Sequence, residues 1–231
     1  MNLRLFNYIE PKLLSGNINT ITTSYATKIV NDVGGTTGFT PVSLSTKLIN
    51  DRAQRHADKW IEETAIHLSL YSSAGITRPK LRSPRKLSRK ERNKILKTKS
   101  FSGDVSGVIG ESIFSSLLIE HFLLAETDFA HFRASVKSGV YPDFGIYTPS
   151  TQLLDKANWG DPLPRFEYPI PAEVKTVTAN EISAIKGRIK KAVEQIRNYW
   201  LTEGSDGASI VCLALRNSDL KSYDLAIIWG S

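Results

Sequence analysis

Two short apolar segments that carry charged residues constrain this chain more than any other feature. The first, YPDFGIY, spans residues 141–147 and contains Asp143; the second, YPIPAEVKT, spans residues 168–176 and contains Glu173 and Lys175. If both segments are strands, alternation puts their apolar side chains on one face and their charged side chains on the other. We therefore expect Asp143, Glu173 and Lys175 to converge outside a common core.

Two carboxylates and an ammonium group in one place are suited to the hydrolysis of a phosphodiester. Asp143 and Glu173 would hold a hard divalent cation, for which Mg²⁺ is the expected ion, and the carbonyl of Val174 is a further candidate ligand. Lys175 would orient the attacking water or stabilise charge in the transition state. An ordinary surface salt bridge between Glu173 and Lys175 is the competing interpretation.

The remaining segments predict helices and strands around these two motifs. Apolar side chains recur at helical spacing in three segments, residues 45–72, 102–126 and 181–201. Further strands are predicted for residues 129–136, 208–216 and 223–229, and a long loop for residues 148–168. Residues 1–42 show short apolar pieces with no clear period.

The basic charge of the chain is concentrated in one segment. The formal net charge is +7, but residues 78–99 contain 11 Lys or Arg and one Glu, a net +10, so the remainder of the chain sums to −3. This density favours contact with a polyanion over simple solvation of a loop. The candidate DNA-binding residues of the segment are Arg85, Lys86, Arg89 and Lys90.

The sequence argues against several other kinds of protein. The single cysteine, Cys212, lies in an apolar run, which excludes an intramolecular disulfide and favours a buried thiol. The four histidines show no metal-ligand spacing, so a zinc finger is not supported; they are His56, His67, His121 and His131. There is no P-loop, no run of about 18 apolar residues and no signal-peptide pattern at the N-terminus, so we expect a soluble, cytoplasmic protein without membrane association.

The motifs resemble those of the PD-(D/E)XK nuclease superfamily, which has the restriction-endonuclease-like fold. The matching residues are Pro142-Asp143 and, after an interval of 29 residues, Glu173-Val174-Lys175. The resemblance covers about residues 104–215 and implies an α/β protein with a central mixed β-sheet flanked by helices. We expect residues 101–231 to form this nuclease core, and residues 1–100 to form a helical, partly irregular and basic region for DNA contact and dimerisation.

The resemblance also implies further site residues on the helices beside the motifs. In the superfamily a glutamate on the preceding helix often joins the metal site, which makes Glu111 a candidate; favourable interaction with the helix dipole is the competing explanation. The helix after the second motif often supports the site or touches DNA, and here it carries Arg188 and Lys191. Gln195 and Tyr199 look like the Q-x-x-x-Y motif of the RecB-like branch, with plain surface polarity as the alternative.

Three functions are compatible with these patterns. The first is a Mg²⁺-dependent endodeoxyribonuclease, of the type II restriction kind, that cuts double-stranded DNA as a homodimer. The second is a recombination or repair nuclease that acts on DNA ends or junctions, which the Q-x-x-x-Y pattern favours. The third is a non-catalytic DNA-binding protein whose basic segment is the whole function.

Overall fold

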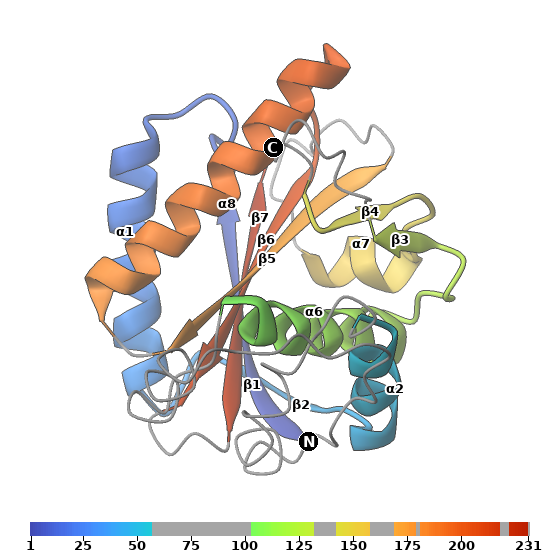
Figure 1. Ribbon diagram of the computed structural model, residues 1–231. Coiled ribbons are helices and arrows are strands. Elements are labelled where there is room, and N and C mark those ends of the chain that lie inside the picture. Colours follow the sequence, from blue (N-terminus) through green and yellow to red (C-terminus); the bar gives the residue numbers. More distant parts are fainter. Residues whose placement is uncertain (57–102, 132–141, 158–168, 179–180, 218–221, 231) are drawn as a thin grey trace, which may run out of the picture.

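The computed structural model describes residues 1–56, 103–131, 142–157, 169–178, 181–217 and 222–230, and it shows an α/β protein built on a seven-stranded sheet (Figure 1). The strands are β1 (Asn2–Glu10), β2 (Thr40–Ser43), β3 (Phe129–His131), β4 (Phe144–Ile146), β5 (Ile170–Thr178), β6 (Ser209–Arg216) and β7 (Tyr223–Gly230). The helices are α1 (Ile18–Gly34), α2 (Thr46–His56), α6 (Gly103–Glu120), α7 (Thr151–Ala157) and α8 (Ile182–Glu203).

The sheet is mixed, with the strand order β2-β1-β7-β6-β5-β4-β3. Two neighbouring pairs are parallel, β1 with β7 and β5 with β6, and the other four are antiparallel. β6 and β7 are buried along their whole length, as expected for central strands covered on both faces. The expected α/β class with a central mixed sheet flanked by helices is confirmed.

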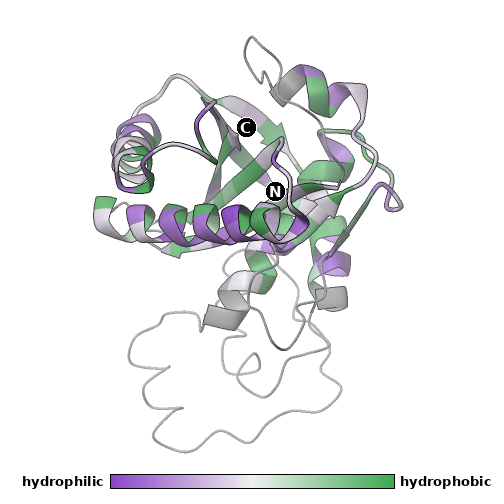
Figure 2. Cartoon of the chain, turned by 90° about the horizontal axis from the view of Figure 1, so that it is seen from above, coloured by the Kyte–Doolittle hydropathy of each residue, from purple (hydrophilic) through white to green (hydrophobic). Residues whose placement is uncertain are grey.

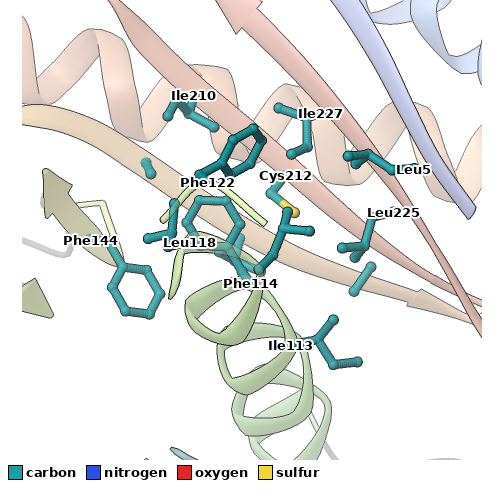
Figure 3. Packing of buried hydrophobic residues seen from close by; sticks show 14 of the residues in the cluster. Leu5, Ile113, Phe114, Leu118, Phe122, Phe144, Ile210, Cys212, Leu225 and Ile227 are labelled. Atoms are coloured by element: carbon teal, nitrogen blue, oxygen red, sulfur yellow. The ribbon is translucent and has the colours of Figure 1, made fainter. Parts of the chain in front are cut away.

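Each face of the sheet packs against its own helices. On one face α6 packs on β5 and β6, and it buries Ile113, Phe114 and Leu118 in the same core cluster as Cys212 and Ile227 (Figure 3). On the other face α8 packs against β5 and β6 and α1 packs beside α8, and both helices share one core cluster with β1, β5, β6 and β7 (Figure 1). Figure 2 shows that the helices carry both hydrophobic and hydrophilic residues along their length, as expected for helices that pack on a sheet with one face.

Local sequence signals explain where several helices begin and end. The side chain of Asn17 accepts hydrogen bonds from the backbone N–H groups of Asn19 and Thr20 and so caps α1. The hydroxyl group of Ser45 accepts from the N–H of Leu48 at 3.3 Å at the start of α2. Helix α8 ends at Gly204, whose φ of 68° is the left-handed conformation typical of a helix C-terminus.

The N-terminal residues belong to the same sheet, which differs from the expected division at residue 100. β1 lies between β2 and β7, and its register with β7 runs from Arg4 opposite Asp224 to Glu10 opposite Gly230. The Arg4 guanidinium donates to both carboxylate oxygens of Asp224, at 2.9 and 2.7 Å, and to the carbonyl oxygens of Val33 and Gly35. Residues 1–43 therefore supply two strands and a helix to the core, not a separate helical region.

Most of the predicted elements are present where the structure describes them. The alternation predicted for β5 is confirmed, because Ile170, Ala172 and Val174 lie in one core cluster and Val177 lies in the other. The predicted loop at residues 148–168 contains the short helix α7. The predicted helix at 45–72 and strand at 129–136 are described only to His56 and His131, and the basic segment 78–99 lies outside the described residues. None of the described helices is long and apolar enough to cross a membrane.

Candidate active site

The two motif strands are neighbours, but they overlap over only three residues. Residues 144–146 of β4 pair antiparallel with residues 172–170 of β5, and β4 begins at Phe144. Beyond this overlap, β5 continues to Thr178 and pairs with β6 on its other side. Within the described residues, no strand pairs with the last part of β5 on the β4 side.

Hydrogen bonds from side chains continue the pairing of the two motifs just before β4 begins. The backbone N–H of Asp143 donates to Oε2 of Glu173 at 3.0 Å, and the N–H of Val174 donates to Oδ2 of Asp143 at 2.9 Å. The Lys175 ammonium donates to Oε1 of Glu173. These bonds fix the Asp143 carboxylate opposite Val174, just beyond the last residue pair of β4 and β5.

Helix α6 brings a third carboxylate to this part of β5. Gly110 lies so close to β5 that a Cβ atom there would meet Oγ1 of Thr176 at 2.4 Å and Cγ1 of Val174 at 3.3 Å. The absence of a side chain at Gly110 lets α6 approach the strand closely. The next residue, Glu111, is half-buried and borders the same space as Asp143.

A polar depression of about 230 Å³ opens at this place. From α6, β5 and the start of β4 it is lined by Gly107, Glu111, Asp143, Val174, Lys175 and Thr176. From α8 it is lined by Arg188, Lys191 and Gln195, which are spaced by three and four residues and so share one face of the helix. The structure thus brings together carboxylates from α6 and the β4 motif, the motif lysine and three of the four residues predicted on α8.

The charges around the depression shift the pKa of two of its groups. Burial, and next the negative charge of Glu111, raise the pKa of Asp143 to about 6, although Lys175 and the Val174 N–H oppose the shift. Burial lowers the pKa of the Lys175 ammonium; the carboxylates of Asp143 and Glu111 oppose this, and Arg188 adds to it. The site therefore holds a carboxyl and an amine that are both shifted towards their neutral forms.

A histidine that the sequence analysis set aside lies beside these carboxylates. His131, at the end of β3, places Nε2 3.1 Å from Oε2 of Glu111. One donor atom from each of Glu111, His131 and Asp143 lies within 4.8 Å of the other two. Spacing along the chain does not reveal His131 as a ligand, because it is the β3–β4 pairing that brings His131 opposite Phe144, next to Asp143.

Two predicted site residues lie elsewhere than expected. Glu173 was expected outside the core, but its side chain is fully buried, because α8 packs across this face of β5. Tyr199 was expected on the polar face of α8, but it is 3% exposed and belongs to the core beside Trp200, with ring centroids 5.1 Å apart. Gln195 therefore borders the depression without Tyr199.

Four predicted DNA-binding residues cannot be placed relative to the depression. Arg85, Lys86, Arg89 and Lys90 lie outside the described residues.

The single cysteine, Cys212, is fully buried, and burial raises the pKa of its thiol far above the ordinary value, as expected for a structural cysteine.

Comparison with models of known protein families gave no match, and comparisons with curated proteins and with solved structures gave none either. The family resemblance therefore rests on the motif residues themselves.

The donor set at the depression fits a divalent cation. Glu111 and Asp143 line the depression and offer carboxylate oxygens, and His131 offers an imidazole nitrogen within 4.8 Å of a carboxylate oxygen of each. Burial and the nearby carboxylate of Glu111 disfavour the negative charge of Asp143 and so raise its pKa. Either a bound proton or a bound metal ion would offset that charge. Arg188 and Lys191 at the rim suit an anionic substrate.

Proposed function

We propose that this protein is a divalent-cation-dependent nuclease that hydrolyses phosphodiester bonds in DNA. One observation carries the proposal: Glu111, Asp143 and Lys175, which come from three separate segments, border the same depression as Arg188 and Lys191. Carboxylates for a cation, an ammonium group and a cationic rim are the parts that hydrolysis of a phosphodiester needs. The resemblance to the PD-(D/E)XK superfamily assigns the same roles to Asp143 and Lys175.

The residues of the chain have distinct roles in this proposal. Arg188 and Lys191 bind the phosphates on either side of the scissile bond, and Asp143 and Glu111 hold the cation. A bound divalent cation would withdraw charge from the phosphate and lower the pKa of a coordinated water. Lys175 positions the attacking water and stabilises the negative charge that builds up on the phosphoryl oxygens.

Glu173 acts mainly through Lys175 and Asp143 in this arrangement. Its Oε1 accepts from the Lys175 ammonium and its Oε2 accepts from the Asp143 backbone, so it holds both groups in place. The expectation that Glu173 also binds the cation remains a prediction. In hydrolysis, the water oxygen bonds to phosphorus and gives up one proton, the bond from phosphorus to the leaving sugar oxygen breaks, and that oxygen takes up one proton, so the products are a phosphomonoester and a free hydroxyl group.

The substrate that we propose is double-stranded DNA, cut at specific sites by a homodimer in the manner of a type II restriction endonuclease. A recombination or repair nuclease is the second candidate, and the position of Gln195 at the depression supports it. With Tyr199 in the core, only one residue of the Q-x-x-x-Y pattern borders the site. The two candidates differ in whether they need a DNA end.

Closed circular plasmid and a methylation-free phage genome test the proposal directly. Each DNA would be incubated with the full chain and Mg²⁺ or Mn²⁺, with a chelator as the control. The proposal predicts cation-dependent linearisation of the plasmid and a reproducible set of phage fragments. Degradation of linear DNA alone would favour the end-acting nuclease. Binding of DNA without any cleavage would overturn the proposal in favour of a non-catalytic DNA-binding protein.

A further inference from the structure

His131 adds a nitrogen donor to the candidate metal site, for which the motifs and the superfamily resemblance predict only oxygen donors. It comes from β3, a strand outside both motifs, and lies beside Glu111 and Asp143, which line the depression; its register partner Phe144 immediately follows Asp143. The ring of Phe144 lies edge-on to the imidazole, with centroids 5.1 Å apart, and so restricts its orientation. The imidazole is therefore held next to Glu111 and Asp143 by the sheet itself.

The distances suit three ligands of one ion. Nε2 of His131 and Oε2 of Glu111 are 3.1 Å apart, and the donor atoms of the three residues lie within 4.8 Å of one another. An octahedral ion with bonds of about 2.1 Å places adjacent ligands about 3 Å apart and opposite ligands about 4.2 Å apart. Small side-chain adjustments would bring all three atoms into such a shell.

The chemistry of the donors decides which ion the site prefers. Mg²⁺ is a hard cation that selects oxygen ligands and keeps much of its water, whereas an imidazole nitrogen favours first-row transition ions. The other acidic side chain of the motifs, Glu173, already accepts a hydrogen bond on each oxygen, from Asp143 and Lys175. The potential ligands that remain are thus the two carboxylates of the depression, Glu111 and Asp143, and the neighbouring His131.

We propose that His131 is a third metal ligand, with Glu111 and Asp143, and that it makes the site select a first-row transition ion such as Mn²⁺ over Mg²⁺. The inference deepens the proposed function and rests on it for the role of the depression, but it concerns binding and is measured without cleavage. Its rival is a plain hydrogen bond from the imidazole to Glu111, which needs no ion.

Paramagnetic resonance of Mn²⁺ alone, titrated into the full chain, tests the assignment. The wild type is expected to bind Mn²⁺ with magnetic coupling to a ¹⁴N nucleus, and Mg²⁺ is expected to displace it only at a concentration about 10-fold higher or more. His131→Ala is expected to lose the nitrogen coupling and to weaken Mn²⁺ binding by about 10- to 100-fold. His121→Ala, which changes a histidine at the far end of α6, serves as the matched control and retains both.

A conservative variant separates a ligand from a hydrogen-bond donor. His131→Gln keeps an N–H group for Glu111 but removes the imidazole nitrogen, so the proposal predicts the same loss as in His131→Ala. Thermal unfolding of each variant without metal checks that it is folded. Wild-type Mn²⁺ binding without nitrogen coupling, full rescue by glutamine or equal affinity for Mg²⁺ would each overturn the proposal.

Binding and cleavage fail separately in this design. If His131→Ala and wild type bind Mn²⁺ alike while both cleave DNA, the ligand assignment is overturned and the nuclease stands. If Mn²⁺ is bound with nitrogen coupling and no DNA substrate is cleaved, the metal site stands and the nuclease is overturned.

Discussion

At the scale of single residues, the candidate site depends on hydrogen bonds that cross between Asp143 and the start of the second motif. The N–H of Asp143 donates to Glu173, and the N–H of Val174 donates to Asp143, so each motif orients the carboxylate of the other. Burial, and next the negative charge of Glu111, raise the pKa of the Asp143 carboxyl that these bonds hold in place.

The pKa of Asp143 predicts how stability depends on pH without metal. Because its folded-state pKa of about 6 lies above the ordinary 3.8, the native state binds a proton more readily than the unfolded chain does. The free energy of unfolding should therefore rise as the pH falls from 7 towards 4, by roughly 1 to 3 kcal/mol from this group. Asp143→Asn should remove this dependence and raise the melting temperature at pH 7.

The measurement is thermal or urea unfolding in a chelator across that pH range. Asp155→Asn, at an exposed position on α7, is the control and should follow the wild type. A pH profile of Asp143→Asn with the same slope as the wild type would show that Asp143 is not the group responsible.

The ion pair between Lys175 and Glu173 predicts a large coupling in stability. Glu173 is fully buried, so Lys175→Met would leave its carboxylate without a counter-ion and cost about 3 kcal/mol. Adding Glu173→Gln should restore most of this loss, because the amide can still accept the N–H of Asp143. A double-mutant cycle in urea measures the coupling. Lys190→Met, which breaks an exposed pair with Glu194, should cost less than about 1 kcal/mol.

Single residues were also the hardest part of the site to predict from sequence. Asp143 and Lys175 were predicted from the two motifs and Glu111 from the resemblance to the superfamily, and all three border one depression. His131 was missed, since its neighbours in space come from a strand pairing that no local pattern reveals. The prediction that Tyr199 lies among the polar residues of α8 was wrong, because an aromatic residue next to Trp200 fits the apolar face of the helix as well as the polar one.

At the scale of elements, the close contact of α6 with β5 sets the position of Glu111. The contact occurs at Gly110, where a methyl group would lie 2.4 Å from Oγ1 of Thr176. The predicted strands and helices near the motifs were correct in type because their periods are clear. The close approach itself was not predicted, since a glycine within a helical pattern does not show what it packs against.

Gly110→Ala tests this contact. Alanine favours a helix over glycine by about 1 kcal/mol, but here the clash with Thr176 should outweigh that gain and push Glu111 away from Asp143. We expect lower stability in urea and weaker Mn²⁺ binding. Gly187→Ala, on the exposed side of α8 with open space around it, should instead stabilise the protein by roughly 0.5 to 1 kcal/mol. Stabilisation by both substitutions would contradict the close contact.

At the scale of the whole molecule, the N-terminal residues complete the sheet that carries the site. Burial of Leu5 and Phe6 joins β1 to both core clusters, and Arg4 ties β1 to Asp224 on β7. The sequence predicted the α/β class and the mixed sheet, but it did not predict that β1 lies parallel to β7. Pairing between strands more than 200 residues apart leaves no trace in local periodicity.

A fragment of residues 101–231 should therefore not fold by itself. Without β1, the edge of β7 and the apolar surface that covers Leu5 and Phe6 would be exposed to water. We expect poor dispersion in a proton–nitrogen correlation spectrum and no cooperative thermal transition, whereas the full chain shows both. A cooperatively folding fragment would restore the division at residue 100 that the sequence suggested.

Cleavage of closed circular plasmid by the wild type, Asp143→Asn and Asp155→Asn tests the central claim most directly, with DNA affinity measured in parallel. If the depression is the active site, the wild type and Asp155→Asn cut in the presence of Mn²⁺ or Mg²⁺. Asp143→Asn should then cut at least about 100-fold more slowly than the wild type, while it binds DNA as tightly. Equal cleavage by Asp143→Asn, or DNA binding without cleavage by every form, would contradict the account.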